Sequence, residues 1–152
     1  MDAKTINKYK NKTIPQLRKI ATRHFNKYIR LRDTNENGYG RCISCGHMLK
    51  YNTPDCQAGH FFPAGHYPTL AYNEDNVNLQ CKSDNYYKSG NLIEYRKNLL
   101  KKIGQKRLDK LYFKAENYKK NGFKQNRFYL IEVIETYKEK CKELGRDKNF
   151  KI

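Results

Sequence analysis

Residues 42–46 read Cys-Ile-Ser-Cys-Gly, two cysteines at the spacing with which a chain binds one tetrahedral zinc ion, followed by a glycine that permits a tight turn. Redox-active cysteine pairs share this spacing. A third cysteine, Cys81, follows at a distance that suits the helix of a zinc-bound hairpin-and-helix unit. The three cysteines together therefore predict a structural zinc site that fixes the fold of the middle of the chain.

The fourth zinc ligand has two candidates. Asp84 lies three residues after Cys81, where a second Cys-x-x-Cys pair would end. Cys56 is the other candidate, because closed structural sites usually use sulfur and nitrogen, and this cysteine is otherwise unexplained in a polar stretch. The predicted zinc ligands are therefore Cys42, Cys45, Cys56 and Cys81, with Asp84 as the alternative to Cys56.

Three polar residues before and after Cys81 in the sequence have the order and spacing of an HNH motif. His60 lies in Gln-Ala-Gly-His-Phe-Phe-Pro, residues 57–63, a short predicted strand that ends at the proline. Asn76 lies five residues before Cys81, and Asn85 lies four residues after it. A lone asparagine before a helix is usually a cap. It is therefore the joint spacing that predicts a site.

Hydrolysis of a phosphodiester uses residues of these kinds. A neutral imidazole takes a proton from water at physiological pH, and a divalent cation neutralises charge on the phosphate. An amide oxygen leaves magnesium open positions for water and phosphate. We therefore predict His60 as general base, Asn85 as ligand of a catalytic magnesium or manganese ion, and Asn76 as organiser of the loop. The remaining histidines, His24, His47 and His66, are predicted to be structural, and His66 is also kept as a possible phosphate contact.

The charge of the chain indicates its partner. Its 152 residues include 32 Lys and Arg against 15 Asp and Glu, a formal net charge of +17. The like charges repel one another in the folded protein, so we expect a polyanionic partner. Nucleic acid is the first candidate. No segment approaches the ~20 apolar residues of a spanning helix, and the first residues lack the apolar core of a secretion signal. We therefore expect DNA as partner, no membrane contact and a reducing, cytoplasmic location, which favours metal binding over disulfides.

The chain is predicted to be a single domain, 1–152, because no repeat or linker divides it. Thr13 and Pro15 mark the start of an amphipathic helix with a basic outer face. The last helix, 126–144, carries an apolar stripe that could form the interface of a homodimer, which symmetric cleavage of a junction would suit. The predicted parts are a mobile basic arm at 1–12, a basic helix at 13–34, a zinc-bound core at about 40–90, and a helical part at 91–145.

At these residues the chain resembles the phage NinG family of recombination proteins, also called Rap, within the wider HNH group. The resemblance runs from the first helix to about residue 111, and more weakly through the last helix. Its most specific part is Lys-Ser-Gly-Asn-Leu at 88–92, followed by Tyr95 and Arg96. The other shared segments are 42–46, 58–60, 76–81 and 103–105. The resemblance implies a structure-specific endonuclease that acts on branched recombination intermediates such as Holliday junctions and D-loops.

Two departures from the family pattern bear on the sites. The family usually has a second Cys-x-x-Cys where this chain has Cys-Lys-Ser-Asp at 81–84, which adds to the preference for Cys56. Many HNH nucleases carry an acidic metal ligand just before the histidine, and NinG relatives can carry aspartate three residues before it. Gly59 and Gln57 occupy these positions here, and a glutamine oxygen is a poorer magnesium ligand than a carboxylate. Nearby carboxylates that could serve instead are Asp55, Glu74 and Asp75.

The predicted fold is α+β, with a zinc-stapled ββα-metal core of HNH-like, treble-clef type framed by several helices. The predicted function is metal-dependent hydrolysis of DNA phosphodiesters, with branched DNA as substrate. Two alternatives stay open. One is an HNH nicking nuclease of another phage pathway. The other is a non-catalytic, zinc-stabilised DNA-binding protein, which the missing acidic residue favours. The residues predicted to bind DNA are Arg23, Lys27, Arg30, Lys88 and Arg96.

Overall fold

The computed structural model describes residues 1–152 as an α+β protein, which confirms the predicted mixture of helices and short strands. No helix has the length and apolar character needed to cross a membrane. In chain order the elements are α1 (Ala3–Lys8), α2 (Ile14–Arg32), β1 (Tyr39–Arg41), β2 (Met48–Lys50), β3 (Gln57–His60), the 3-10 helix η1 (Pro68–Leu70), β4 (Val77–Gln80), the π-helical turn η2 (Ser83–Tyr87), α3 (Leu92–Ile103), α4 (Gln105–Asn121) and α5 (Arg127–Arg146).

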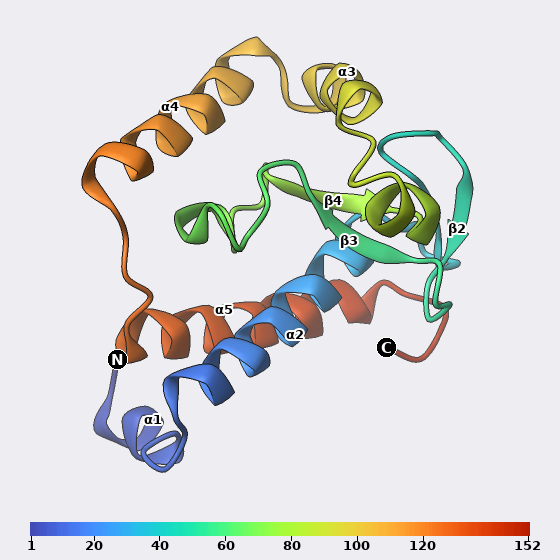
Figure 1. Cartoon of the computed structure of the whole chain (residues 1–152). Coiled ribbons are helices and arrows are strands. Elements are labelled where there is room, and N and C mark those ends of the chain that lie inside the picture. The colour runs from blue at the N-terminus through green and yellow to red at the C-terminus, as the bar shows by residue number, and fades with distance from the viewer.

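The antiparallel hairpin β3–β4 lies between two helical layers (Figure 1). Helices α2 and α5 pack side by side along one side of the hairpin, and α3 and α4 lie on the other. The register pairs Gln57 with Gln80 and His60 with Val77. Strands β1 and β2 form a second, separate antiparallel pair. The β3–β4 hairpin is thus the central layer from which the candidate catalytic residues project.

Helix α2 forms where the sequence predicts a basic helix at 13–34. A capping box begins it: the Thr13 hydroxyl accepts from the Gln16 amide at 3.4 Å, and the Gln16 side chain accepts from the Thr13 amide at 2.9 Å. Its apolar face is buried against α5 and the hairpin. The α2 residues with no exposed surface are Leu17, Ala21, Phe25, Ile29 and Leu31.

The apolar stripe of α5 packs against α2. Leu130, Ile131 and Ile134 have no exposed surface, and they belong to the same core as the apolar face of α2. Cys141 on this stripe is buried, and its thiol donates to the His24 carbonyl at 3.6 Å. The suggestion that this stripe forms a dimer interface is therefore wrong, because the fold of the chain itself uses it.

A smaller core holds the other helical layer on the hairpin. The side chain of Tyr95 in α3 is fully buried, and its hydroxyl donates to the Gly59 carbonyl of β3 at 2.7 Å. The same hydroxyl accepts from the Asn78 side chain of β4 at 3.1 Å. A buried tyrosine needs such partners for its hydroxyl. Tyr95 therefore fixes α3 against both strands, and Leu108 and Leu111 of α4 pack around it.

The Asp33 carboxylate joins three elements. It accepts from the Leu79 amide of β4 at 2.9 Å, from Arg32 Nε at the end of α2 at 2.8 Å and from Lys102 Nζ of α3 at 2.9 Å. Its side chain is only 10% exposed. Burial raises the pKa of Asp33, but the hydrogen bonds and charges of Arg32 and Lys102 lower it below its ordinary value of 3.8. The ionised carboxylate therefore holds both helical layers to the hairpin.

The first twelve residues differ from the mobile arm that the sequence predicts. They contain helix α1, and the Tyr9 side chain is only 6% exposed. Arg127 donates to the carbonyls of Tyr9 and Lys12 at 3.1 and 2.7 Å, and Glu135 accepts hydrogen bonds from Lys8 and Tyr9. The basic composition suggested a solvated arm, but a buried tyrosine and these contacts attach the segment to α5.

Replacing Asp33 with asparagine should destabilise the protein by about 2 kcal/mol, because it removes the counter-charge of the half-buried Arg32 and of the more exposed Lys102. The folded-state pKa lies below 3.8, so the carboxylate stabilises the protein above that pH and loses its effect as the pH falls through the folded value. Urea unfolding at several pH values should therefore show the wild type losing an acid-sensitive contribution that Asp33→Asn lacks.

The matched control for this prediction is Asp75→Asn. Asp75 pairs with the exposed Arg107 at the surface, where an ion pair contributes about 0–1 kcal/mol. Equal losses of stability in the two variants would contradict the special role of Asp33.

Candidate metal centre and active-site residues

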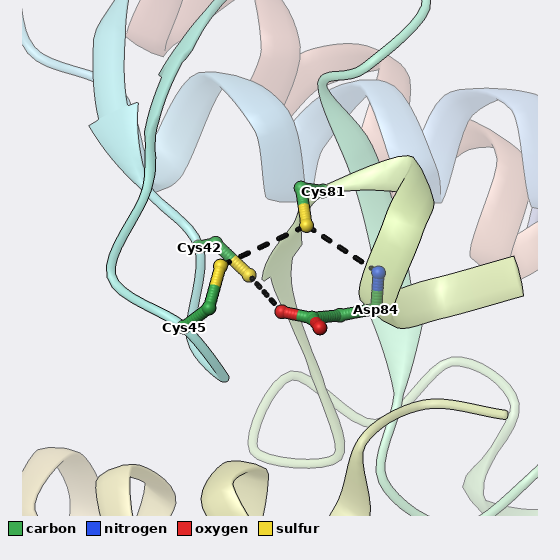
Figure 2. Close-up of side chains that lie close together, drawn as sticks. All are labelled: Cys42, Cys45, Cys81 and Asp84. Atoms are coloured by element: carbon green, nitrogen blue, oxygen red, sulfur yellow. Dashed lines mark hydrogen bonds between the residues drawn. The ribbon is translucent and has the colours of Figure 1, made fainter. Parts of the chain in front are cut away.

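Cys42, Cys45, Cys81 and Asp84 form one compact group, with one ligand atom from each lying within 4.8 Å of all the others. Figure 2 shows their side chains converging from two parts of the chain. Cys42 and Cys45 flank the turn after β1, Cys81 follows β4, and Asp84 lies in η2. The three predicted cysteines are therefore brought together by the fold, and Asp84, the alternative fourth ligand, joins them.

The spacing of the group fits a tetrahedral zinc ion. Two thiolates bound at about 2.3 Å in a tetrahedron lie about 3.8 Å apart. The Cys45 and Cys81 sulfurs are 3.8 Å apart, and the Cys42 sulfur lies 3.3 Å from an Asp84 carboxylate oxygen. Three thiols and one carboxylate within this volume are chemically suited to zinc. The residues therefore fit one structural zinc ion.

Asp84 is prepared for a ligand role by its surroundings. Burial raises its pKa, but hydrogen bonds from Cys45, Cys42 and Asn91 lower it to about 2. Its other oxygen accepts from the Asn91 side chain at 3.1 Å and lies 3.3 Å from Lys88 Nζ. An oriented, ionised carboxylate with such outer partners is typical of a metal ligand.

Cys56, the predicted fourth ligand, does not belong to this group. It is buried next to the cluster in a small apolar core with Leu49 and Leu79. Burial raises the pKa of its thiol to about 11, so it stays neutral there. The preference for Cys56 relied on the usual preference of zinc for sulfur. The local turn instead brings the residue three positions after Cys81 into the group, so the geometry favours Asp84, the alternative.

The backbone shapes the first half of the metal group. Gly46 adopts a positive φ of 73°, and its amide donates to the Cys42 carbonyl at 2.9 Å. This conformation is open to glycine at no steric cost. The amide of Ile43, the residue after Cys42, donates to the Leu79 carbonyl at 2.8 Å. The cysteine turn is thus attached directly to β4, the strand that leads to Cys81.

His60 ends β3 with its imidazole largely buried. One ring nitrogen, Nε2, lies 2.9 Å from the Ala71 carbonyl oxygen. Because a carbonyl only accepts, this contact requires the proton on Nε2 and leaves the lone pair on Nδ1. Burial lowers the pKa of His60 below its ordinary value of 6.5, against an opposing effect of the Ala71 contact. The imidazole is therefore neutral at physiological pH, with one nitrogen able to take a proton.

Asn76 organises the loop between β3 and β4. Its side-chain oxygen accepts from the Phe62 amide at 2.8 Å, and its nitrogen donates to the Phe62 and Leu70 carbonyls, both at 3.0 Å. The residue has no exposed surface. These bonds close the loop that carries Ala71, the hydrogen-bond partner of His60. The geometry is the one expected for a loop organiser.

Asn85 lies in η2 beside Gln57 of β3. Its side-chain nitrogen donates to the Gln57 oxygen at 2.9 Å, which leaves the Asn85 oxygen free for another partner. His60 is on the opposite face of the strand from Gln57, because side chains alternate along a strand. It shares its face with Ala58, which packs against the core of α2 and α5. The structure thus brings Asn85 to Gln57 and Asn76 to the His60 loop, and it shows no contact between His60 and Asn85.

The position before His60 cannot hold a side chain in this structure. A Cβ atom on Gly59 would lie 1.9 Å from the side-chain oxygen of Gln80 and 2.9 Å from its Cβ. Gln80 is fixed, because its nitrogen donates to the Ser44 hydroxyl at 2.8 Å and to the Gly90 carbonyl at 2.6 Å. The acidic residue found there in many HNH nucleases is therefore excluded by packing.

The three alternative carboxylates are engaged elsewhere. Glu74 accepts hydrogen bonds from Tyr28, Tyr137 and Lys140, which tie the hairpin loop to α2 and α5. Asp75 pairs with Arg107. Asp55 accepts from the backbone amide of Lys82 at 2.9 Å. Glu74 and Asp75 are therefore engaged in ion pairs, whereas Asp55 keeps one carboxylate oxygen without a hydrogen bond.

The residues predicted to bind DNA divide between the two helical layers. On α2, Arg23 is exposed, and Lys27 and Arg30 are half-buried. On the other layer, Lys88 and Arg96 are exposed, and Arg96 also donates to the Tyr112 hydroxyl at 3.2 Å. The two groups lie on different elements, so they need separate tests.

Sequence reasoning missed the ion-pair network of Arg32, Asp33 and Lys102. An aspartate directly after the last arginine of a basic helix was the available signal. The partner on α3 lies far along the chain, and no local pattern identifies it.

The purified protein should contain one zinc ion per chain, measured by inductively coupled plasma mass spectrometry. Cys42→Ser should lose the ion and unfold the middle of the chain, because binding energy at a structural zinc is also folding energy. Asp84→Ala should lose zinc readily to a chelator, whereas Asp84→Cys should retain it with a four-sulfur site.

Cys56→Ser is the matched control, since Cys56 is buried beside the group without belonging to it. It should keep its zinc. Well-folded wild-type protein without zinc, or zinc loss from Cys56→Ser and not from Asp84→Ala, would contradict this ligand set.

Comparison with known proteins identifies the family. The chain matches the family model described as Bacteriophage Lambda NinG protein over residues 1–147. It is 31% identical to Protein ninG of Escherichia phage lambda over 131 residues, which covers 86% of this chain and 58% of that protein. It is 30% identical to Protein ninG of Escherichia phage 933W over 131 residues, covering 86% and 59%. For Protein ninG of Salmonella phage P22 the identity is 31% over 126 residues, covering 83% and 56%.

The matched region spans less than two thirds of the length of each of these relatives. No solved structure gives a significant match to the chain. The family match nevertheless covers nearly the whole chain and includes the segment 88–92 on which the resemblance mainly rested. The chain therefore belongs to the bacteriophage lambda NinG family.

Proposed function

We propose that this NinG-family protein is a metal-dependent DNA endonuclease of the HNH type, with a treble-clef core built around structural zinc. The observation that carries the proposal is the state of His60. Its imidazole is neutral, its Nε2 is held by the Ala71 carbonyl, and its Nδ1 keeps a lone pair. A histidine fixed in this way at the end of a hairpin is suited to act as a general base. The net charge of +17 supplies the attraction for DNA.

In the proposed reaction, Nδ1 of His60 takes a proton from a water molecule whose oxygen attacks the phosphorus. The phosphorus–oxygen bond to one sugar breaks, and the leaving oxygen takes a proton from solvent. Asn76 keeps the loop and the Ala71 carbonyl in place, so that His60 stays in the required tautomer. A magnesium or manganese ion, held by the Asn85 oxygen together with a DNA phosphate, would neutralise the charge on the phosphate and the leaving oxygen.

The proposed substrate is branched DNA, such as a Holliday junction or a D-loop in phage recombination. This part of the proposal rests on the resemblance to NinG recombination proteins. An HNH nicking nuclease of another phage pathway would use the same residues on a different DNA. A panel of four-way junctions, D-loops and nicked or intact duplexes separates the two.

A second candidate function is a non-catalytic, zinc-stabilised DNA-binding protein. Two observations favour it. Gln57 occupies a place where NinG relatives can carry an aspartate, and His60 and Asn85 lie on opposite faces of β3. Such a protein would bind junctions and cut none of them. The two candidates share the zinc site and the charge, so only cleavage distinguishes them.

DNA binding should fall by about two to three orders of magnitude between 50 and 200 mM salt if five or more Lys and Arg contact phosphates. Fluorescence anisotropy with a labelled junction measures this slope. Each phosphate contact removed should make the slope of log affinity against log salt concentration shallower by about 0.9. Arg23→Ala tests the α2 layer and Lys88→Ala tests the opposite layer, so the variant with the shallower slope identifies the DNA-facing side.

Lys142→Ala serves as the control, because this exposed lysine of α5 is paired with Glu139. It should leave the slope unchanged. Affinity that does not depend on salt would refute the electrostatic account.

His60→Ala should slow cleavage of a four-way junction by about 10²–10⁴-fold while leaving junction binding nearly intact. The imidazole is proposed to act on water and not to hold the DNA, so its loss affects the rate and not the affinity. Asn85→Ala should also abolish cleavage, and added manganese should restore part of it if Asn85 is a metal ligand. Gel assays with magnesium or manganese measure the rate.

His66→Ala is the control from the same loop, because His66 is exposed and makes no side-chain hydrogen bond. It should keep most of the activity. If wild type and His60→Ala bind the junction equally and neither cuts it with any divalent cation, the non-catalytic DNA-binding function is the correct one.

A further inference from the structure

Tyr86 and Tyr87 form an exposed aromatic pair directly after the candidate metal ligand Asn85. Their side chains are 73% and 70% exposed, among the most exposed of the large hydrophobic residues in the chain. Their ring centroids are 5.0 Å apart, with the ring planes at 85° to one another. The two rings thus present a face and an edge to solvent in one place on η2.

The fold does not use these rings. Neither tyrosine belongs to a hydrophobic core, and neither hydroxyl makes a hydrogen bond. The turn is held by its backbone instead: the Lys88 amide donates to the Ser83 carbonyl at 3.0 Å, and the Gly90 amide donates to the Asp84 carbonyl at 2.7 Å. Two large rings left in water without a structural role suggest a binding partner.

The segment of the chain that carries the pair is basic. Between residues 82 and 102 there are six basic residues and two acidic ones. Asp84 is buried in the metal group, and Glu94 pairs with Lys97 at 2.8 Å. Lys82 and Lys88, the basic residues nearest to the pair in the sequence, are both exposed. The other basic residues are Arg96, Lys97, Lys101 and Lys102. Aromatic rings within a basic segment are suited to a polyanion that also has flat apolar faces.

We propose that Tyr86 and Tyr87 stack on unpaired bases of DNA, so that the protein selects branched DNA with unpaired nucleotides next to the branch point. This inference rests on the proposed DNA function and names its substrate class. Bases inside a duplex are covered by their neighbours, whereas an unpaired base offers a free face, and stacking on tyrosine is tolerant of sequence. The rings adjoin Asn85 in the chain, so a stacked base places the neighbouring phosphate near that residue.

The charge also argues against a second copy of the chain as occupant. Two chains of +17 each repel one another, and the segment that carries the pair is also basic. Single-stranded DNA has the opposite charge and supplies bases for both rings.

The test is binding without cleavage, measured with no divalent cation added. The probes are a single strand of about twelve nucleotides carrying 2-aminopurine and a fully paired duplex of the same length. The double variant Tyr86→Ala/Tyr87→Ala should bind the single strand about tenfold or more weakly than wild type, with duplex affinity changed less than about twofold. The double Tyr→Phe variant should bind like wild type, because stacking needs the ring and not the hydroxyl.

Two controls make the result specific. Phe113→Ala removes a ring of α4 that is 72% exposed and lies on another helix, and it should change neither affinity. The 2-aminopurine fluorescence should be quenched on binding by wild type and by the Phe variant, and not by the Ala variant. Zinc content and unfolding temperature should be the same in all of them, since the two rings make no buried contact.

Unchanged single-strand affinity in the Ala variant would overturn the proposal, as would an equal loss for strand and duplex. A change in sedimentation coefficient with unchanged DNA binding would also overturn it, because the pair would then be a protein interface. The result is independent of the nuclease proposal. If stacking fails while His60-dependent cleavage persists, the endonuclease stands without this specificity; if stacking holds and no DNA is cut, only the catalytic proposal fails.

Discussion

The carboxylate of Asp33 is the constraint on which the arrangement of the layers depends. It is almost fully buried, and it binds the end of α2, the backbone of β4 and a lysine of α3 at once. A charge in such a place is stable only with well-placed partners. The β3–β4 hairpin has few apolar residues of its own, so its position depends on this ionic contact and on the Tyr95 hydroxyl from the other side.

The metal group adds a second constraint, local to one end of the hairpin. It connects the turn after β1 to the turn after β4, which are far apart in the sequence, and it adjoins a small apolar core of five buried residues. A metal ion bound by this group would add its binding energy to the stability of the fold. Asp84 gives the group a carboxylate, which lies 3.3 Å from Lys88 Nζ. The site thus lies next to the turn that carries Asn85.

Some of these features follow from local sequence, and others do not. Thr13 and Pro15 mark the start of α2, and the Cys-x-x-Cys pair with Cys81 indicates the metal group, because both depend on residues close in the chain or on a strict chemical type. The presence of Asp84 and not Cys56 in the cysteine group follows from the geometry of one turn, which composition does not reveal. The apolar stripe of α5 was visible in the sequence, but whether it faces α2 or another molecule depends on tertiary packing. His60 is separated from Asn85 because Gln57, the partner of Asn85, lies three positions before His60 on β3 and so points to the opposite face. The spacing of these residues around Cys81 does not reveal this.

The close approach of Gln80 to Gly59 limits how this chain can evolve. Gln80 is fixed by Ser44 and Gly90, so a residue with a side chain at position 59 requires that Gln80 change first. Position 57 carries no such restriction, because Gln57 lies half-exposed beside Asn85. One substitution at position 57 therefore introduces an acidic side chain beside Asn85, whereas an acidic side chain at position 59 needs at least two substitutions. Lineages derived from this chain should accordingly gain or lose a carboxylate at the strand's start and keep glycine beside the histidine.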